Sequence, residues 1–394
     1  MTAAPAPSAA AVVDAVRLAL RRKSGPVALH EPEFRGRERE YLAECIDTGW
    51  VSSAGKFVDR FEAMLAEYTG AKYAVATVNG SAALQVCLRL AGVGQGDEVL
   101  VPSLTFIATA NAVSYALGTP HFVESEEATL GVDAAKLEAY LKESAELCRE
   151  GCVNRRTGAT IRALMPMHTF GHPVDLDGLA ALCARWRIAL VEDAAESLGS
   201  TYKGRHTGNF GLAAGLSFNG NKIVTSGGGG AILSNDAKIG ARAKHLTTTA
   251  RVPHKWSFIH DEVGYNYRLP NLNAALGCAQ LERLPDLLAR KRALASRYQD
   301  AFKGVAGVRF AAEPANCRSN YWLNTILLDA PDSAAREAVL EALNREGFGA
   351  RPAWTLMHRL PMYQHCPRMD LAFTEDLERR IVNLPSSAAL ADAA

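Results

Sequence analysis

The segment Ser217-Phe218-Asn219-Gly220-Asn221-Lys222 places one lysine among small residues, and Gly227-Gly228-Gly229-Gly230 follows shortly after it. Glycine lets a backbone approach a bulky neighbour closely, so this run predicts a tight backbone beside a ligand. A lysine in such a place can lose part of its hydration and become neutral, and a neutral amine attacks an aldehyde. A solvated surface lysine is the ordinary alternative, which the glycine run argues against.

An acidic segment, Val191-Glu192-Asp193-Ala194, ends an apolar run further upstream. Open α/β sheets bind ligands beyond the carboxyl ends of their strands, where Asp193 would lie. Its carboxylate could pair with a pyridinium N–H, although an aspartate that caps a helix is an alternative. An amine that forms a Schiff base and an acid at the ring nitrogen are what pyridoxal 5′-phosphate (PLP) requires. The sequence therefore predicts a PLP enzyme with Lys222 and Asp193 as its catalytic residues.

The turn Asn79-Gly80-Ser81 stands between a strand-like run and a helical run. Backbone N–H groups at a helix N-terminus favour an anion, and Gly80 would let the backbone approach it. Ser217 offers a hydroxyl to the same phosphate, while a plain capped turn is the alternative interpretation. The sequence contains neither a P-loop nor a dinucleotide-binding glycine fingerprint.

Strand-like and helical segments alternate between residues 74 and 233. Runs such as 97–102 and 163–167 are apolar and strand-like, whereas 176–186 has helical periodicity. This alternation predicts an α/β fold with a mostly parallel central sheet that is covered on both faces.

The pattern changes after residue 255, where 273–302 is mostly helical and a strand is expected at 324–328. A smaller C-terminal α+β domain is the expected result. We predict three parts: an N-terminal extension (1–26), a large PLP-binding domain (27–255) and a small C-terminal domain (256–394).

The overall charge is nearly balanced, with 43 basic and 42 acidic residues in a chain of 394. Such a chain has no broad basic field for nucleic acid or an anionic membrane. No apolar run approaches the roughly 20 residues of a membrane span, and the N-terminus does not have the order of a signal peptide. The eight scattered cysteines predict no disulfide framework. We predict a cytoplasmic enzyme without a metal site.

Several motifs together resemble the DegT-type sugar-nucleotide aminotransferases, which are fold-type I PLP enzymes. They are Asn79-Gly80-Ser81, Pro102-Ser103-Leu104-Thr105-Phe106, Glu192-Asp193-Ala194-Ala195-Glu196-Ser197, Ser217-x4-Lys222 and Gly264-Tyr265-Asn266-Tyr267-Arg268. Longer stretches are similar to the branch from the legionaminic-acid and bacillosamine pathways, among them Pro166-Met167-His168-Thr169-Phe170-Gly171-His172-Pro173 and Ser319-Asn320-Tyr321-Trp322-Leu323-Asn324. The resemblance runs from about residue 27 to Ser387.

The resemblance implies a role for most of these residues. Lys222 carries the Schiff base and moves a proton between two carbons, while Asp193 binds the pyridine nitrogen. Phe106 stacks on the ring, for which an ordinary core aromatic is the alternative. The residues implied to hold the phosphate are Gly80, Ser81 and Ser217.

Two further cofactor-binding residues follow from the resemblance. Asn266 reaches the phosphate of the neighbouring subunit, so a homodimer with shared active sites is expected. Glu196 stands where many relatives carry His or Gln near the phenolic oxygen of the cofactor. A carboxylate would repel a phenolate there unless it is protonated or turned away, so the role of Glu196 stays open.

Weaker candidates for substrate binding are basic residues outside these motifs, namely His168, Arg251, His254 and Arg351. A structural hydrogen bond is an equal alternative for His168. A solvated interface loop is the alternative for Arg251 and His254. Trp354 and His358 are candidates of the same kind as Arg351.

The resemblance implies two half-reactions. L-Glutamate aminates the cofactor, which then aminates a nucleotide-linked 4-keto-6-deoxy-N-acetylhexosamine for a bacterial surface glycan, with UDP favoured over GDP. The alternatives are a 3-keto sugar-nucleotide aminotransferase, a non-catalytic regulator that binds PLP or a sugar nucleotide, and an NAD-dependent dehydratase. Lys222 argues against the related 3-dehydrases, which carry histidine there, and the missing glycine fingerprint argues against the NAD enzyme.

Overall fold

The computed structural model describes residues 6–149 and 151–392, whose larger part is built on a nine-stranded sheet. Its strands are β1 (Tyr73–Thr77), β2 (Glu98–Pro102), β3 (Thr119–Val123), β4 (Ala145–Cys148), β5 (Gly151–Asn154), β6 (Thr160–Leu164), β7 (Ala189–Asp193), β10 (Ala213–Ser217) and β11 (Gly230–Ser234). The main path runs β1-β11-β10-β7-β6-β2-β3, and every neighbouring pair from β10 to β3 is parallel. Strand β11 is antiparallel to both neighbours. The predicted mostly parallel α/β sheet is confirmed.

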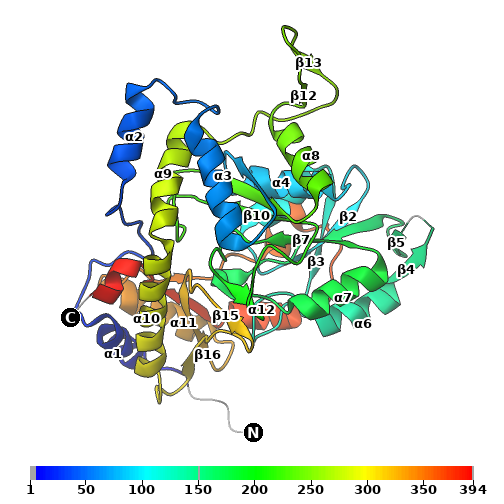
Figure 1. The fold of residues 1–394 in the computed structure, drawn as a ribbon. Coiled ribbons are helices and arrows are strands. Elements are labelled where there is room, and N and C mark those ends of the chain that lie inside the picture. The colour runs from blue at the N-terminus through cyan, green and yellow to red at the C-terminus, as the bar shows by residue number, and fades with distance from the viewer. Residues whose placement is uncertain (1–5, 150, 393–394) are drawn as a thin grey trace.

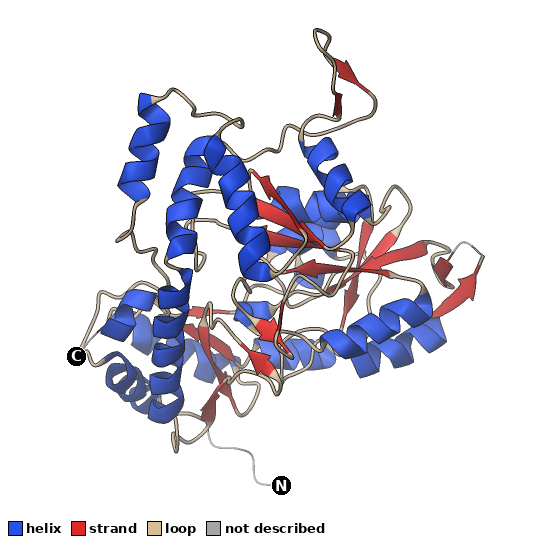
Figure 2. Cartoon of the chain, viewed as in Figure 1, coloured by secondary structure: helices blue, strands red, loops and turns tan. Residues whose placement is uncertain are grey.

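Helices cover both faces of this sheet (Figures 1 and 2). They are α3 (Lys56–Thr69), α4 (Gly80–Leu90), α5 (Ile107–Tyr115), α6 (Ala134–Ser144), α7 (Leu176–Trp186) and α8 (Ala237–Thr247). Successive side chains of a strand point to opposite faces, and β11 follows this rule. Ile232 packs in the cluster with α4 and α7, whereas Ala231 and Leu233 pack in the cluster with α3. Every residue of β11 is buried, as expected for a strand covered on both faces.

The smaller part has its own four-stranded antiparallel sheet, ordered β14-β16-β18-β17. Its strands are β14 (Val308–Phe310), β16 (Asn324–Leu328), β17 (Arg351–Pro352) and β18 (Ile381–Leu384). Helices α1 (Ala9–Leu20), α10 (Leu284–Ala301) and α11 (Ser333–Arg345) share an apolar cluster with this sheet. The sheet and its helices form the expected smaller α+β part.

The N-terminal extension contributes to that smaller part. Ser8 caps α1, because its hydroxyl accepts a hydrogen bond from the N–H of Ala11 at 3.5 Å. Val12, Val16 and Leu20 lie one helical turn apart and are completely buried. Helix α1 therefore packs against α10 and α11 through one apolar face.

The helix predicted at 273–302 is two helices, α9 (Asn271–Glu282) and α10, which meet at Arg283. Pro285 lies in the first turn of α10, where its missing N–H costs nothing, but a proline cannot continue the preceding helix. Helix α9 packs on α3 and on α2 (Glu38–Asp47), while α10 packs in the smaller part.

The remaining elements are short. They are β8 (Thr201–Tyr202), β9 (Arg205–His206), β12 (Arg251–Val252), β13 (Ile259–His260), β15 (Cys317–Arg318), α12 (Ala372–Glu378), η1 (Thr169–Gly171), η2 (Met357–Arg359), η3 (Pro361–Tyr363) and η4 (Ala388–Asp392). The hairpin β12–β13 projects from the body of the molecule (Figure 1), and the predicted boundary at 255/256 falls inside it. Within residues 6–149 and 151–392, no helix has the length and apolar character needed to cross a membrane.

Candidate active site

A pocket of about 280 Å³ opens at the carboxyl ends of β7 and β10. The two strands are parallel neighbours, so their last residues, Asp193 and Ser217, lie at the same edge of the sheet. Ligands of open α/β sheets bind at this edge. The pocket brings together seven of the predicted site residues: Gly80, Ser81, Phe106, Asp193, Glu196, Ser217 and Lys222.

Lys222 is held in the wall of this pocket and exposes 11% of its side chain. Its Nζ lies 3.2 Å from Oε1 of Glu196 and 3.9 Å from the centroid of the Trp322 ring. The other oxygen of Glu196 accepts a hydrogen bond from the N–H of Phe170 at 2.9 Å. Burial raises the pKa of Glu196 to about 7, although the nearby Lys222 opposes the rise.

Asp193 ends β7 with its carboxylate fixed inside the pocket and only 2% of the residue exposed. Oδ2 accepts a hydrogen bond from Thr109 Oγ1 at 2.7 Å, and Oδ1 accepts one from the N–H of Ala195 at 3.1 Å. Burial raises the pKa of Asp193, because the ionised form loses its hydration. A cationic partner such as a pyridinium N–H would stabilise that ionised form.

The first turn of α4 also lines the pocket. Asn79 caps the helix, with Oδ1 accepting from the N–H of Ala82 at 2.8 Å. A Cβ atom on Gly80 would lie 2.9 Å from Cβ of Ser217, and one on Gly230 would lie 2.4 Å from the carbonyl oxygen of Asn79. Glycine at both positions keeps the helix N-terminus close to the Ser217 hydroxyl, an arrangement that suits a phosphate.

Aromatic side chains from distant parts of the chain line the rest of the pocket. Phe106 is 45% exposed, and its ring centroid lies 6.1 Å from that of Trp354. Trp354 also packs on Phe170 at 5.0 Å. No local pattern in the sequence places Trp322 here, although the stretch 319–324 is part of the family resemblance. Both tryptophans follow residue 255, so only the folded chain brings them to the pocket.

None of the four substrate-binding candidates, His168, Arg251, His254 and Arg351, lines this pocket. His168 is completely buried; its Nδ1 accepts from the N–H of Val174 at 3.3 Å, and its Nε2 therefore donates to Glu192 at 3.2 Å. Arg351 is exposed on β17, and its guanidinium donates to Asn344 Oδ1 at 3.0 Å. Neither residue lines the Lys222 pocket.

Asn266, Arg251 and His254 come together in a second pocket of about 460 Å³ beside the hairpin β12–β13. The two pockets share no lining residue. Arg268 borders the second pocket, and its buried guanidinium pairs with Glu62 at 2.7 Å. Within one chain, Asn266 is therefore separate from Lys222.

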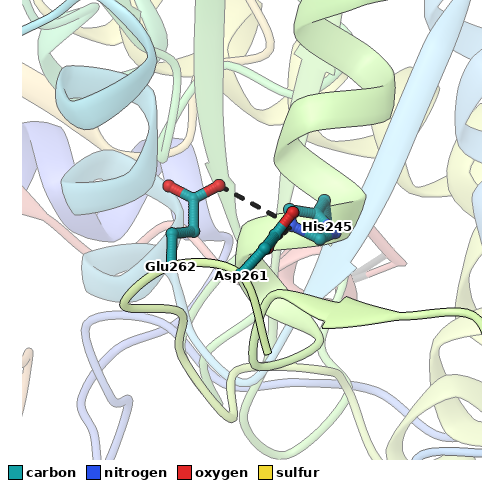
Figure 3. A group of neighbouring side chains, drawn as sticks. All are labelled: His245, Asp261 and Glu262. Carbon is teal, nitrogen blue, oxygen red and sulfur yellow. Dashed lines mark hydrogen bonds and ion pairs between the residues drawn. The ribbon is translucent and has the colours of Figure 1, made fainter. Parts of the chain in front are cut away.

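One group of three residues in the described part of the chain has the donor types of a cation site: His245, Asp261 and Glu262 (Figure 3). His245 Nε2 lies 2.7 Å from Asp261 Oδ1 and 3.6 Å from Glu262 Oε1. Both carboxylate oxygens of Glu262 also pair with the guanidinium of Arg242. These ion pairs join α8 to the chain that follows β13.

Residues 32–394 match the DegT/DnrJ/EryC1/StrS aminotransferase family. The chain belongs to this family. The predicted family, fold class and enzyme class are thereby confirmed.

Curated and solved relatives support the membership in the DegT/DnrJ/EryC1/StrS family. The chain is 37% identical over 370 residues to GDP-perosamine synthase of Caulobacter vibrioides, covering 93% of this chain and 95% of that one. An aminotransferase of the same family from Brucella abortus aligns with a TM-score of 0.81 and 27% identity over 90% of this chain and 92% of that one. DesI, solved in the presence of its TDP-sugar product, aligns with a TM-score of 0.79 and 27% identity over 95% of each chain.

Aminotransferases of the DegT/DnrJ/EryC1/StrS family depend on PLP, which confirms the predicted cofactor. The Lys222 pocket contains donors that fit this group. It offers an amine for the aldehyde, a buried carboxylate for the ring nitrogen, and a helix N-terminus with a serine hydroxyl for the phosphate.

Proposed function

We propose that this enzyme transfers an amino group from L-glutamate to the keto group of a nucleotide-linked 4-keto-6-deoxy-N-acetylhexosamine. The observation that carries the proposal is the convergence of Lys222, Asp193 and the N-terminus of α4 on one pocket. When bound, PLP accepts the amino group of the donor and passes it to the acceptor.

The chain supplies binding and proton transfer for this chemistry. Lys222 Nζ binds the aldehyde and later accepts and returns a proton, and the same amine serves both half-reactions because they are chemical mirrors. Asp193 holds the ring nitrogen. Glu196, 3.2 Å from Lys222 Nζ, lies where it can balance the charge of the protonated amine.

The remaining cofactor contacts are proposed as follows. Gly80, Ser81 and Ser217 hold the phosphate, and Phe106 covers the ring at the open side of the pocket. Glu196, beside Lys222, is proposed to contact the phenolic oxygen when its carboxyl is protonated, so every predicted cofactor-binding residue in this pocket has a contact with the bound group.

The proposed sugar follows the resemblance to the legionaminic-acid and bacillosamine branch, for which UDP is the favoured nucleotide. The relative named GDP-perosamine synthase supports GDP as well, and DesI was solved with a TDP-sugar. A role in bacterial surface glycan synthesis, a cytoplasmic location and a 3-keto sugar as the alternative acceptor stay as predictions.

The proposal is tested by the visible absorption of the purified enzyme. L-Glutamate should remove the yellow band of the bound cofactor, and the accepted keto sugar nucleotide should restore it. UDP-, GDP- and TDP-linked 4-keto and 3-keto sugars are added one at a time, and mass spectrometry identifies the amino sugar. A protein that shows no band even with added PLP would support the regulator instead.

We expect Asn266→Ala to weaken PLP binding by about tenfold or more, the scale of a lost hydrogen bond to a charged group. Asn266 lies outside the Lys222 pocket of its own chain, so we propose that it serves the pocket of a second subunit. PLP affinity is measured by titration of the cofactor-free chain.

Mixed dimers test the sharing of sites directly. A dimer of one Asn266→Ala chain and one Lys222→Ala chain, isolated through two different tags, contains one intact site and one doubly altered site. At a PLP concentration that saturates the wild type but not Asn266→Ala, we expect about half of the wild-type activity from each mixed dimer. Under the same conditions Lys222→Ala alone is nearly inactive and Asn266→Ala alone is mostly without cofactor. A fully active monomer, or an inactive mixed dimer, would contradict the shared site.

Glu196→Gln should change how PLP affinity depends on pH. The pKa of Glu196 is raised to about 7, so its carboxyl is mostly protonated below pH 7 and ionised above it. The protonated form can donate to the phenolic oxygen, whereas the ionised form repels it, so affinity should fall as the pH rises through about 7.

The glutamine variant keeps a hydrogen-bond donor but cannot ionise, so its PLP affinity should not show this fall with rising pH. We expect the ratio of the wild-type to the variant dissociation constant to rise about tenfold between pH 6 and pH 8, the equivalent of one pKa unit of differential interaction. Titration of both proteins with PLP across this range gives the ratio. A ratio that does not change with pH would exclude this role for Glu196.

A further inference from the structure

Trp322 contacts the catalytic lysine, although it belongs to the segment that leads into β16 of the smaller sheet. Its ring centroid lies 3.9 Å from Nζ of Lys222, and only 5% of the residue is exposed. A cation this close to an indole face is attracted by the ring quadrupole, and more strongly when water is excluded. Together with Glu196 at 3.2 Å, the ring provides two favourable contacts for the ammonium form of Lys222.

The indole is fixed with respect to Lys222 by its own hydrogen bond. Nε1–H of Trp322 donates to the carbonyl oxygen of Asn221 at 2.8 Å, and Asn221 is the residue before Lys222. The ring is therefore tied to the same backbone that carries the lysine. Rotation of the indole away from Lys222 would break this bond and leave a part-buried carbonyl without its partner.

The backbone of Trp322 is fixed from two other directions. Its N–H donates to Asn320 Oδ1 at 2.8 Å, and the amide of Asn320 donates to the carbonyl oxygen of Glu196 at 2.8 Å. Its carbonyl oxygen accepts from Nζ of Lys291 at 3.2 Å, and Lys291 is almost completely buried in α10. Hydrogen bonds thus connect the Trp322 segment both to the backbone of Glu196, through Asn320, and to Lys291 of α10.

We propose that Trp322 is a positioning residue for Lys222, and that its indole face stabilises the ammonium form of the lysine beside Glu196. The inference rests on the proposed function, in which Nζ of Lys222 gains a proton from one carbon and releases it to another. The proton forms an N–H bond as the C–H bond breaks, and the reverse happens at the second carbon. The ring favours the state in which the lysine carries this proton.

The test measures the reactivity of Lys222 in the full-length chain freed of PLP, so it does not depend on turnover. Short pulses of acetic anhydride at pH 7 to 11 acylate a lysine side chain only in its neutral amine form. Peptide mass spectrometry then gives the acylation of Lys222 relative to Lys303, which exposes 70% of its side chain. Wild type is compared with Trp322→Phe and Trp322→Leu.

We expect Trp322→Leu to raise the relative acylation of Lys222 by about three- to thirtyfold near pH 8. The value for Trp322→Phe should lie between those of the wild type and Trp322→Leu. The difference should narrow as the pH rises, because the ring contact favours only the ammonium form. Trp354→Leu is the matched control, because Trp354 lines the same pocket but packs on Phe106 and Phe170. It should not reproduce this pH-dependent rise.

Two outcomes would overturn the proposal: an unchanged acylation of Lys222, or an increase of the same size at every pH. The second would show that the leucine variant only admits more reagent. Failure of the proposed function is distinguishable, because it would appear as no response of the wild-type cofactor band to L-glutamate, whatever the acylation result.

Discussion

Lys222→Ala is expected to retain PLP but to lose amino transfer, with the rate of each half-reaction falling by about a thousandfold or more. General acid–base catalysis by one positioned side chain contributes about 10²–10⁴ in rate, and this lysine is also proposed to bind the aldehyde. Among the described residues that line the pocket, Lys222 is the only lysine. The other groups of the pocket cannot replace an amine in both roles.

The rate is measured as the loss of the cofactor's visible band after rapid mixing with L-glutamate. Lys203→Ala is the control, since Lys203 is an exposed lysine that pairs with Asp177 outside the pocket. A small primary amine added to Lys222→Ala should restore part of the rate, because it can carry the proton. Turnover of Lys222→Ala at the wild-type rate would refute the assignment.

Asp193→Asn is expected to lower the rate of the half-reaction with L-glutamate by about a hundredfold or more, the scale of losing one preorganised charged group. Asparagine has nearly the same shape: its Oδ1 can still accept from the N–H of Ala195, and its Nδ2 can donate to the hydroxyl oxygen of Thr109. The variant therefore removes the negative charge from the ring nitrogen while it disturbs the pocket little. A pyridine nitrogen without that charge is less often protonated and withdraws electrons less well.

A PLP analogue that is methylated on the ring nitrogen distinguishes charge from shape. This analogue is permanently cationic, so it should bring Asp193→Asn closer to wild type. Glu192→Gln is the matched control, because the adjacent Glu192 is equally buried but binds the backbone N–H groups of Gly208, Phe210 and Gly211. Glu192→Gln should lower thermal stability, and the methylated analogue should not change the rate of this variant relative to wild type. An unchanged rate in Asp193→Asn would refute the proposed role of Asp193.

The residues proposed as catalytic could be predicted because each follows a local signal. Asp193 ends an apolar strand, and Gly80 opens a helix after a strand, so the carboxyl edge of a parallel sheet brings them together. The strand that immediately precedes Lys222 was not predicted. Ala213-Ala214-Gly215-Leu216-Ser217 has little intrinsic preference for β structure, and its pairing with β7 and β11 places it in the sheet.

The strand predicted at 163–167 is observed earlier, as β6 at Thr160–Leu164. Pro166 lacks an N–H group and cannot take part fully in a central ladder, so the regular strand ends before it. No local pattern places Trp322 in the pocket, and the sequence offers Trp354 only as a weak candidate beside Arg351. Trp322 and Trp354 reach the pocket only because the smaller part packs against the larger one.

Helix α1 lies outside the stretch that matches the family model but inside the apolar core of the smaller part. The family match begins at residue 32, yet Val12, Val16 and Leu20 complete the apolar cluster of the smaller sheet. Burial of each such side chain is worth roughly 1.5–3 kcal/mol. A chain shortened to the family limits would keep every residue of the Lys222 pocket and lose part of the core beneath α10 and α11. The stretch that matches the family model is thus shorter than the unit that folds.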